Sequence, residues 1–122
     1  MEFDNIVLIH RENGKFIKEG FSINVDKCYE NIKSFYQEDE KIFLYLNIEQ
    51  DFTDEVFNKI FDELCYDDFY NLNVDIYPKD DEYYPTFVIE MEIESKEEIQ
   101  RKVYDVLELF EEKVIKIYCN NI

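Results

Sequence analysis

The stretch FVIEMEIESKEEI, residues 87–99, decides the fold. Its first half alternates between apolar and mostly charged residues, which is the pattern of a β-strand with one buried face. Its second half contains the S-x-x-E capping box that begins a helix, from Ser95 to Glu98. The stretch therefore predicts a strand over 85–94, followed directly by a helix. The inward face of this strand carries Phe87, Ile89, Met91 and Ile93, and the outward face carries Val88, Glu90, Glu92 and Glu94.

The segments around this stretch complete one predicted unit. Residues 41–49, KIFLYLNIE, are apolar on both faces, as in a central strand. Residues 51–65 place apolar side chains at helical spacing, and residues 70–77 alternate like a strand. The helix that begins at Ser95 is followed by VIKIYC, residues 114–119, which predicts the last strand.

The order of these elements defines the predicted fold class. From residue 41 onward the order is β-α-β-β-α-β, which is the ferredoxin-like arrangement. It predicts an α+β protein in which residues 41–119 form a four-stranded antiparallel sheet with both helices on one face. The length of 122 residues predicts a single domain, 1–122, made of an N-terminal extension (1–40) and this core (41–122).

The N-terminal extension is predicted to be a ββα unit. Residues 5–11 and 15–23 predict two strands, and the pair Asn13-Gly14 between them suits a tight hairpin turn. Residues 26–37 place apolar side chains at helical spacing. This unit either extends the sheet or packs over its open face.

Acidic residues dominate the charge of the chain. Thirty Asp and Glu face 13 Lys and Arg, for a formal net charge of -17. Residues 1–35 carry six acids and five bases, whereas residues 36–122 carry 24 acids and eight bases. Such an asymmetry acts on solubility and association rather than on the fold. With 46% hydrophobic and 17% aromatic residues, the chain has enough apolar material to fold.

The outward face of the predicted sheet is the candidate functional surface. The strand over 85–94 contributes three carboxylates, and neighbouring strands add acidic and tyrosine side chains. Solvation alone explains such residues, because an exposed sheet face has to be partly polar. The same surface also suits a basic protein, since acidic surfaces speed association and tyrosine is enriched at interface centres. The candidate partner-binding residues are Asp75, Tyr77, Glu90, Glu92, Glu94, Tyr45 and Tyr118.

The residue types that other functional classes need are scarce. Nucleic-acid binding depends on Lys and Arg that neutralise phosphates, whereas the predicted platform carries carboxylates, so we expect no direct binding to nucleic acid. The single histidine, His10, lies at a strand end, and two glycines build no phosphate-binding loop. The paired acids in 65–71 and 79–84 lack the spacing of a calcium loop, and the three cysteines include no C-x-x-C pair. We therefore expect that the protein is not an enzyme, that it has no catalytic residue and that it binds no metal and no cofactor.

Three segments carry a resemblance to a known family: NIVLIHRENGKFIKE (5–19), FLYLNI (43–48) and EYYPTFVIEMEIE (82–94). They resemble a small family of uncharacterised acidic proteins from clostridia and related Firmicutes. The resemblance implies a bacterial, cytosolic protein and gives no residue a role. Because no apolar run reaches membrane-spanning length and the acidic N-terminus lacks the basic region of a signal peptide, we expect a cytoplasmic location and no membrane partner.

Two functional hypotheses remain open. The first is a non-enzymatic protein-binding module of inhibitor or immunity type, a monomer or weak homodimer that docks a basic protein through its acidic face. Binding of this kind weakens as salt increases. The alternative is a small-molecule-sensing regulatory domain that acts as a dimer and is stabilised by its ligand.

Overall fold

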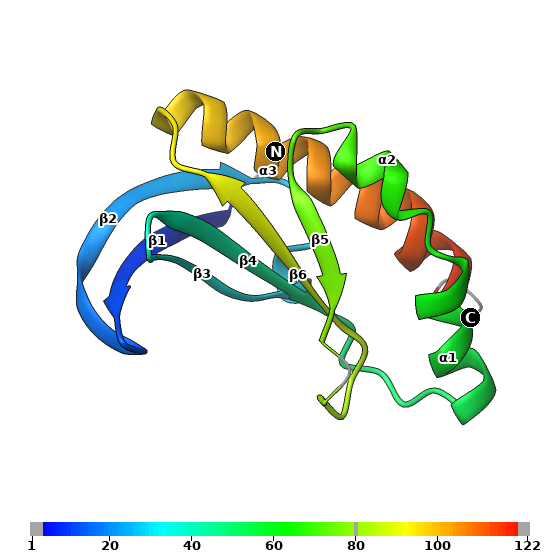
Figure 1. Ribbon diagram of the computed structural model, residues 1–122. Coiled ribbons are helices and arrows are strands. Elements are labelled where there is room, and N and C mark those ends of the chain that lie inside the picture. Colours follow the sequence, from blue (N-terminus) through cyan, green and yellow to red (C-terminus); the bar gives the residue numbers. More distant parts are fainter. Residues whose placement is uncertain (1–3, 80, 120–122) are drawn as a thin grey trace.

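The computed structural model describes residues 4–79 and 81–119 of the chain. These residues form a mixed sheet that packs against helices, so the protein is α+β, as the sequence predicts (Figure 1). The six strands are β1 (Asp4–Glu12), β2 (Lys15–Val25), β3 (Ile32–Glu38), β4 (Lys41–Asn47), β5 (Asp75–Pro78) and β6 (Thr86–Glu92). Their order in the sheet is β2-β1-β3-β4-β6-β5. Strands β1 and β3 are parallel, and every other neighbouring pair is antiparallel.

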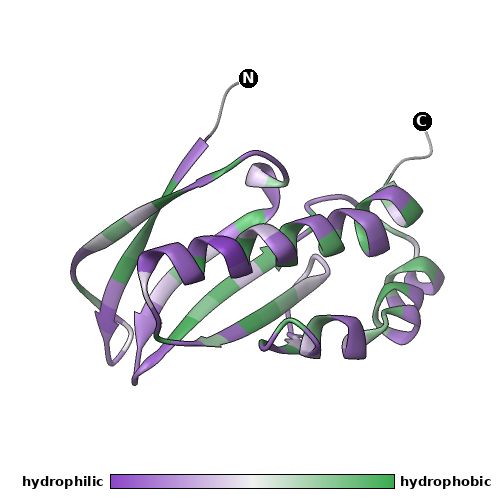
Figure 2. Cartoon of the chain, turned by 90° about the horizontal axis from the view of Figure 1, so that it is seen from above, coloured by the Kyte–Doolittle hydropathy of each residue, from purple (hydrophilic) through white to green (hydrophobic). Residues whose placement is uncertain are grey.

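The helices of the described residues are α1 (Asp54–Glu63), α2 (Tyr66–Tyr70) and α3 (Lys96–Phe110), with a short 3-10 helix, η1 (Tyr29–Asn31), and a π-helix, η2 (Glu111–Cys119). Helix α3 crosses the sheet and buries its apolar stripe (Figure 2). The Ser95 Oγ accepts a hydrogen bond from the Glu98 N–H at 3.2 Å. The predicted N-cap therefore starts this helix at the expected residue.

One hydrophobic core lies between the helices and one face of the sheet. Leu44 and Ile89, which face inward from β4 and β6, are fully buried. Ile60, Phe69 and Phe110, one from each α-helix, join the same cluster. Burying each such side chain stabilises the fold by about 1.5–3 kcal/mol. Because all of these helices pack on one side, we call the opposite side of the sheet the open face.

The predicted helix over 26–37 is wrong. Only η1 is helical in this region, and it is followed by β3, which lies between β1 and β4. Cys28 precedes η1 with a φ of 57°, which is incompatible with a continuous helix. The segment EDEK, 38–41, is a hairpin turn in which Asp39 and Glu40 have φ values of 54° and 65°. Positive φ at both central residues is the geometry of a two-residue hairpin. The N-terminal unit therefore extends the sheet.

The predicted strand over 114–119 is also wrong, because these residues belong to η2, which continues directly from α3. In a ferredoxin-like sheet the last strand lies beside the first one. In this structure, β3 occupies that position next to β4. The sheet order therefore differs from the ferredoxin-like order, although the predicted neighbourhood β4-β6-β5 is present.

The bounds of the predicted strands differ from those in the structure, and two of the differences concern the candidate surface. The strand predicted over 70–77 begins only at Asp75, because Tyr66–Tyr70 form α2 and Asn73 adopts a left-handed φ of 62°. The strand predicted over 85–94 ends at Glu92. Ile93, which was expected to face inward, is consequently 45% exposed.

Candidate binding site on the open sheet face

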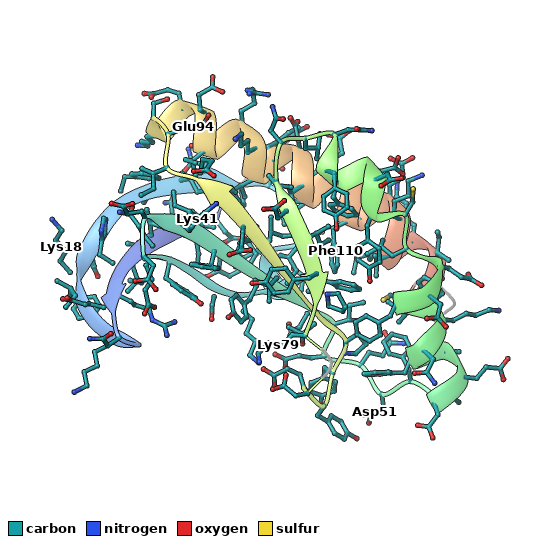
Figure 3. All side chains as sticks on the ribbon, in the orientation of Figure 1. Lys18, Lys41, Asp51, Lys79, Glu94 and Phe110 are labelled. Carbon is teal, nitrogen blue, oxygen red and sulfur yellow. The ribbon has the colours of Figure 1, made fainter. Side chains whose placement is uncertain are left out.

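The open face carries the outward residues of β3, β4, β6 and β5 in cross-strand rows. Antiparallel partners direct their side chains to the same side of a sheet, so the strand register fixes which residues are neighbours. Lys41 and Lys79 lie toward opposite ends of these strands (Figure 3). The rows are Glu38–Lys41–Glu92, Tyr36–Phe43–Glu90–Asp75 and Ser34–Tyr45–Val88–Tyr77.

Four aromatic side chains, Tyr36, Phe43, Tyr45 and Tyr77, form what we call the aromatic patch. The ring of Tyr36 stacks on that of Phe43 with centroids 5.1 Å apart, and its hydroxyl donates to the Tyr45 hydroxyl at 3.1 Å. Val88 lies between Tyr45 and Tyr77 in the register and is only 1% exposed, although it faces outward. The patch therefore has packing of its own, outside the main core.

The local environment perturbs two hydroxyls of the aromatic patch. Burial, and then the hydrogen bond with Tyr45, raise the pKa of Tyr36 well above its ordinary value. Burial, followed by the negative charge of Glu90, raises the pKa of Tyr77. Both hydroxyls therefore stay protonated to a higher pH than an ordinary tyrosine; that of Tyr36 is already donated to Tyr45, whereas Tyr77 is 41% exposed.

Two carboxylates, Asp75 and Glu90, face each other directly across β5 and β6, and we call them the acidic pair. Like charges in directly opposed positions destabilise a sheet. Within residues 4–79 and 81–119, neither carboxylate has an ion-pair partner. By contrast, Glu92 in the next row is paired with the Lys41 Nζ at 2.8 Å. The acidic pair is therefore unneutralised on an otherwise paired surface.

The acidic pair lines a hollow of about 520 Å³ between the sheet edge and the helices. Lys102, from α3, closes one side of this hollow and is 6% exposed. Its Nζ lies 2.8 Å from the Glu94 Oε2 and donates to the Asn73 carbonyl at 3.5 Å. The ammonium group of Lys102 is thus already paired with oxygen atoms of the protein itself.

The structure brings five of the seven candidate residues together on the open face: Tyr45, Asp75, Tyr77, Glu90 and Glu92. Glu94 lies beyond the end of β6, where it pairs with Lys102 at the rim of the hollow. Tyr118 lies on η2 and donates a hydrogen bond to the Glu63 Oε2 at 3.0 Å, away from the sheet. Its expected place on the open face is wrong, because its segment is helical.

Sequence reasoning missed the contribution of β1 and β3 to this face. The Arg11 guanidinium lies over the Tyr36 ring, 3.9 Å from its centroid, and its Nε lies 3.5 Å from the Glu38 Oε1. Tyr36 escaped notice because it was placed on a helix. The signal that could have placed it was the segment EDEK, 38–41, which is equally compatible with a hairpin turn. A turn at this place would make residues 32–38 a strand.

The histidine and the buried cysteine, which could serve other kinds of site, are packed against the protein's own residues. His10 packs over Gly20, where an added Cβ would lie 2.6 Å from the His10 Nε2. Burial, with the nearby charge of Glu111, raises the pKa of the Cys28 thiol to about 12. Across the described ranges, no three His, Cys, Asp or Glu side chains lie close enough together to hold a metal ion. No helix in those ranges is both long and apolar enough to cross a membrane.

The fold and this face define a mixed α+β protein with an open sheet surface that is acidic at one edge and aromatic at its centre. The chain belongs to a family of unknown function (DUF6762), whose model matches residues 1–121. No curated protein and no solved structure matches the chain.

Proposed function

We propose that the chain is a non-enzymatic binding module that docks a basic protein through its open face, in the manner of an inhibitor or immunity protein. The observation that carries the proposal is the unneutralised acidic pair, Asp75 and Glu90, directly beside the aromatic patch. The setting that we propose is the bacterial cytoplasm, in line with the acidic clostridial proteins that the sequence resembles.

The electrostatics of the acidic pair support this proposal. Carboxylates that face each other directly across two strands repel and so destabilise the sheet. A basic side chain placed between them removes this repulsion and forms charge-assisted hydrogen bonds. Binding of a cationic partner therefore lowers the electrostatic free energy of the open face.

The aromatic patch and the net charge support it further. Tyr77 is 41% exposed, and tyrosine supplies a rigid apolar body with a polar tip at the centre of many interfaces. The net charge of -17 attracts a basic protein over long range and raises its association rate. The acidic pair and the patch then supply the short-range contacts.

The test is binding of a defined basic peptide at low and high salt, measured by calorimetry. The double variant Asp75→Asn/Glu90→Gln removes two charges from the open face. Its matched control, Asp62→Asn/Glu108→Gln, removes the same two charges from exposed positions on α1 and α3. We expect the face variant to weaken binding by about tenfold or more at low salt, and the control by less than about threefold. Equal losses would show that the peptide responds to net charge alone and would overturn the proposal.

A further inference from the structure

The acidic pair and the rings beside it point to one particular kind of side chain. We propose that the basic partner anchors on this face through an arginine, whose guanidinium lies between the acidic pair and the rings of Phe43 and Tyr77. This inference rests on the proposed function and specifies its partner. The position of the rings, the pairing of the nearby lysines and a contact that the molecule already contains support it.

The strand register places rings next to the acidic pair. Phe43 is the cross-strand partner of Glu90, on the side away from Asp75. Tyr77 is two residues from Asp75 on the same strand, so it faces the same side about 6.8 Å away. A cation held by the two carboxylates therefore lies within reach of both rings.

The hollow has room for a long side chain. Its volume is about 520 Å³, and its lining includes the acidic pair, Lys41 and Glu92, whereas the rings of Phe43 and Tyr77 lie outside it. The two lysines that line the hollow form no ion pair with Asp75 or Glu90, because Lys41 is paired with Glu92 and Lys102 with Glu94. The acidic pair is left with two acceptor groups and no donor among the described residues.

Arginine suits this geometry better than lysine does. Side chains directly opposed in a sheet have Cβ atoms about 4.5–5.5 Å apart, so one planar guanidinium with five donors can reach both carboxylates. Its flat face also stacks on aromatic rings, which the compact and strongly hydrated ammonium of lysine does less well.

The open face already contains one example of this contact. Arg11 stacks on Tyr36 at 3.9 Å from the ring centroid while its Nε lies 3.5 Å from a carboxylate oxygen of Glu38. A guanidinium held by a tyrosine ring and a carboxylate is thus an arrangement that this face supports. Phe43, Tyr77 and the acidic pair repeat the same combination of rings and carboxylates at the other edge, with no ion-pairing cation among the described residues.

The test compares two peptides of equal length and charge, one with four arginines and one with four lysines in the same Gly-Ser frame. We expect the wild-type protein to bind the arginine peptide about tenfold more tightly. The double variant Phe43→Leu/Tyr77→Leu keeps apolar bulk but removes the rings, and we expect it to reduce this preference to less than about threefold. Tyr104→Leu, at a comparably exposed tyrosine on α3, is the matched control and leaves the preference unchanged.

The outcomes separate this inference from the proposed function. Equal affinity for the two peptides, with binding that still depends on Asp75 and Glu90, overturns the arginine anchor and leaves the docking proposal standing. An arginine preference that survives Phe43→Leu/Tyr77→Leu overturns the placement of the guanidinium on these rings. Failure of the wild-type protein to bind either peptide overturns both proposals.

Discussion

The two sides of strands β4 and β6 differ in what their residues contribute. On the covered side, Ile42, Leu44, Leu46, Phe87, Ile89 and Met91 are all at most 1% exposed. On the open side, the same strands carry Lys41, Phe43, Tyr45, Val88, Glu90 and Glu92. Because strand side chains alternate, a shift of one residue along the chain moves a substitution from the core to the candidate binding surface. Stability and partner binding are therefore separable in this sheet.

The largest effect is expected on the covered side, from Phe87→Ala. The Phe87 ring is fully buried and packs against Phe61 at 5.1 Å and Phe110 at 6.3 Å between centroids. Truncation of such a residue costs about 3–5 kcal/mol of unfolding free energy. Phe43→Ala, on the open side, is the matched control. We expect it to cost less than half as much in urea unfolding, and equal costs would show that the open face is as stabilising as the core.

A smaller effect is expected from Tyr36→Phe, in the aromatic patch. At neutral pH the variant loses the hydroxyl hydrogen bond with Tyr45, which contributes about 0.5–1.5 kcal/mol. It also changes the alkaline response, because the pKa of Tyr36 is raised above its ordinary value of 10.0. The stability that this shift supplies is complete below about pH 10 and is lost as the pH rises through the raised pKa.

Unfolding by urea at pH 8 and at about pH 10.5 checks this expectation. The wild-type protein should lose more stability between the two pH values than Tyr36→Phe does. Tyr29→Phe is the control, since Tyr29 is 46% exposed. If Tyr36→Phe and the wild-type protein lose the same amount, the hydroxyl is not the source of the alkaline response.

The region around 87–99 could be predicted because its signals are local. Alternation, the Ser95 cap and the apolar stripe of α3 each act within a few residues, and the structure contains all three. The segments 26–37 and 114–119 failed because each is compatible with more than one conformation on its own. One position beside β4 was available, and β3 takes it through a two-residue turn with β4. That competition is decided by tertiary pairing and is invisible to a local pattern.

In the candidate site, too, the residues placed by local alternation could be predicted, whereas those placed by distant strand pairing could not. Glu90, Glu92, Asp75 and Tyr77 share a face because alternation is local and the neighbourhood β6-β5 was expected. Tyr36 and Arg11 were missed because their contribution depends on where β3 and β1 join the sheet. The direct opposition of Asp75 and Glu90 also required the actual register.

The variant Glu90→Gln sharpens the comparison, because it should change stability and binding in opposite directions. Removing one member of the acidic pair relieves the repulsion between two directly opposed like charges, so the unfolding free energy should rise slightly. The same change should weaken binding of the arginine peptide. Glu108→Gln, on the exposed side of α3, is the charge-matched control. A loss of stability in Glu90→Gln would contradict the view that this carboxylate is unneutralised in the free protein.

The smallest effect is expected from the exposed pair of Lys41 and Glu92. The hydrogen bond between them raises the pKa of Lys41 above 10.5 and lowers that of Glu92 below 4.5. A depressed carboxyl pKa contributes stability above its unfolded value, which is lost as the pH falls through the folded value. The raised lysine pKa contributes stability below about 10.5 that is lost on further alkalinisation. The coupling between Lys41→Met and Glu92→Gln in a double-mutant cycle should therefore be present at pH 7 and should decrease as the pH falls through the lowered pKa of Glu92.

A substitution of Lys41 alone also tests whether stability and partner binding are separable. Lys41 lines the same hollow as the acidic pair, and the charges of both Glu90 and Asp75 help to raise its pKa. Lys41→Met should barely change stability, since exposed ion pairs contribute little. It should nevertheless tighten binding of the arginine peptide by about threefold, because one competing positive charge is removed at short range. Weaker binding by Lys41→Met would mean that the lysine itself contacts the partner, and the open face would then recognise a mixed surface rather than a basic one.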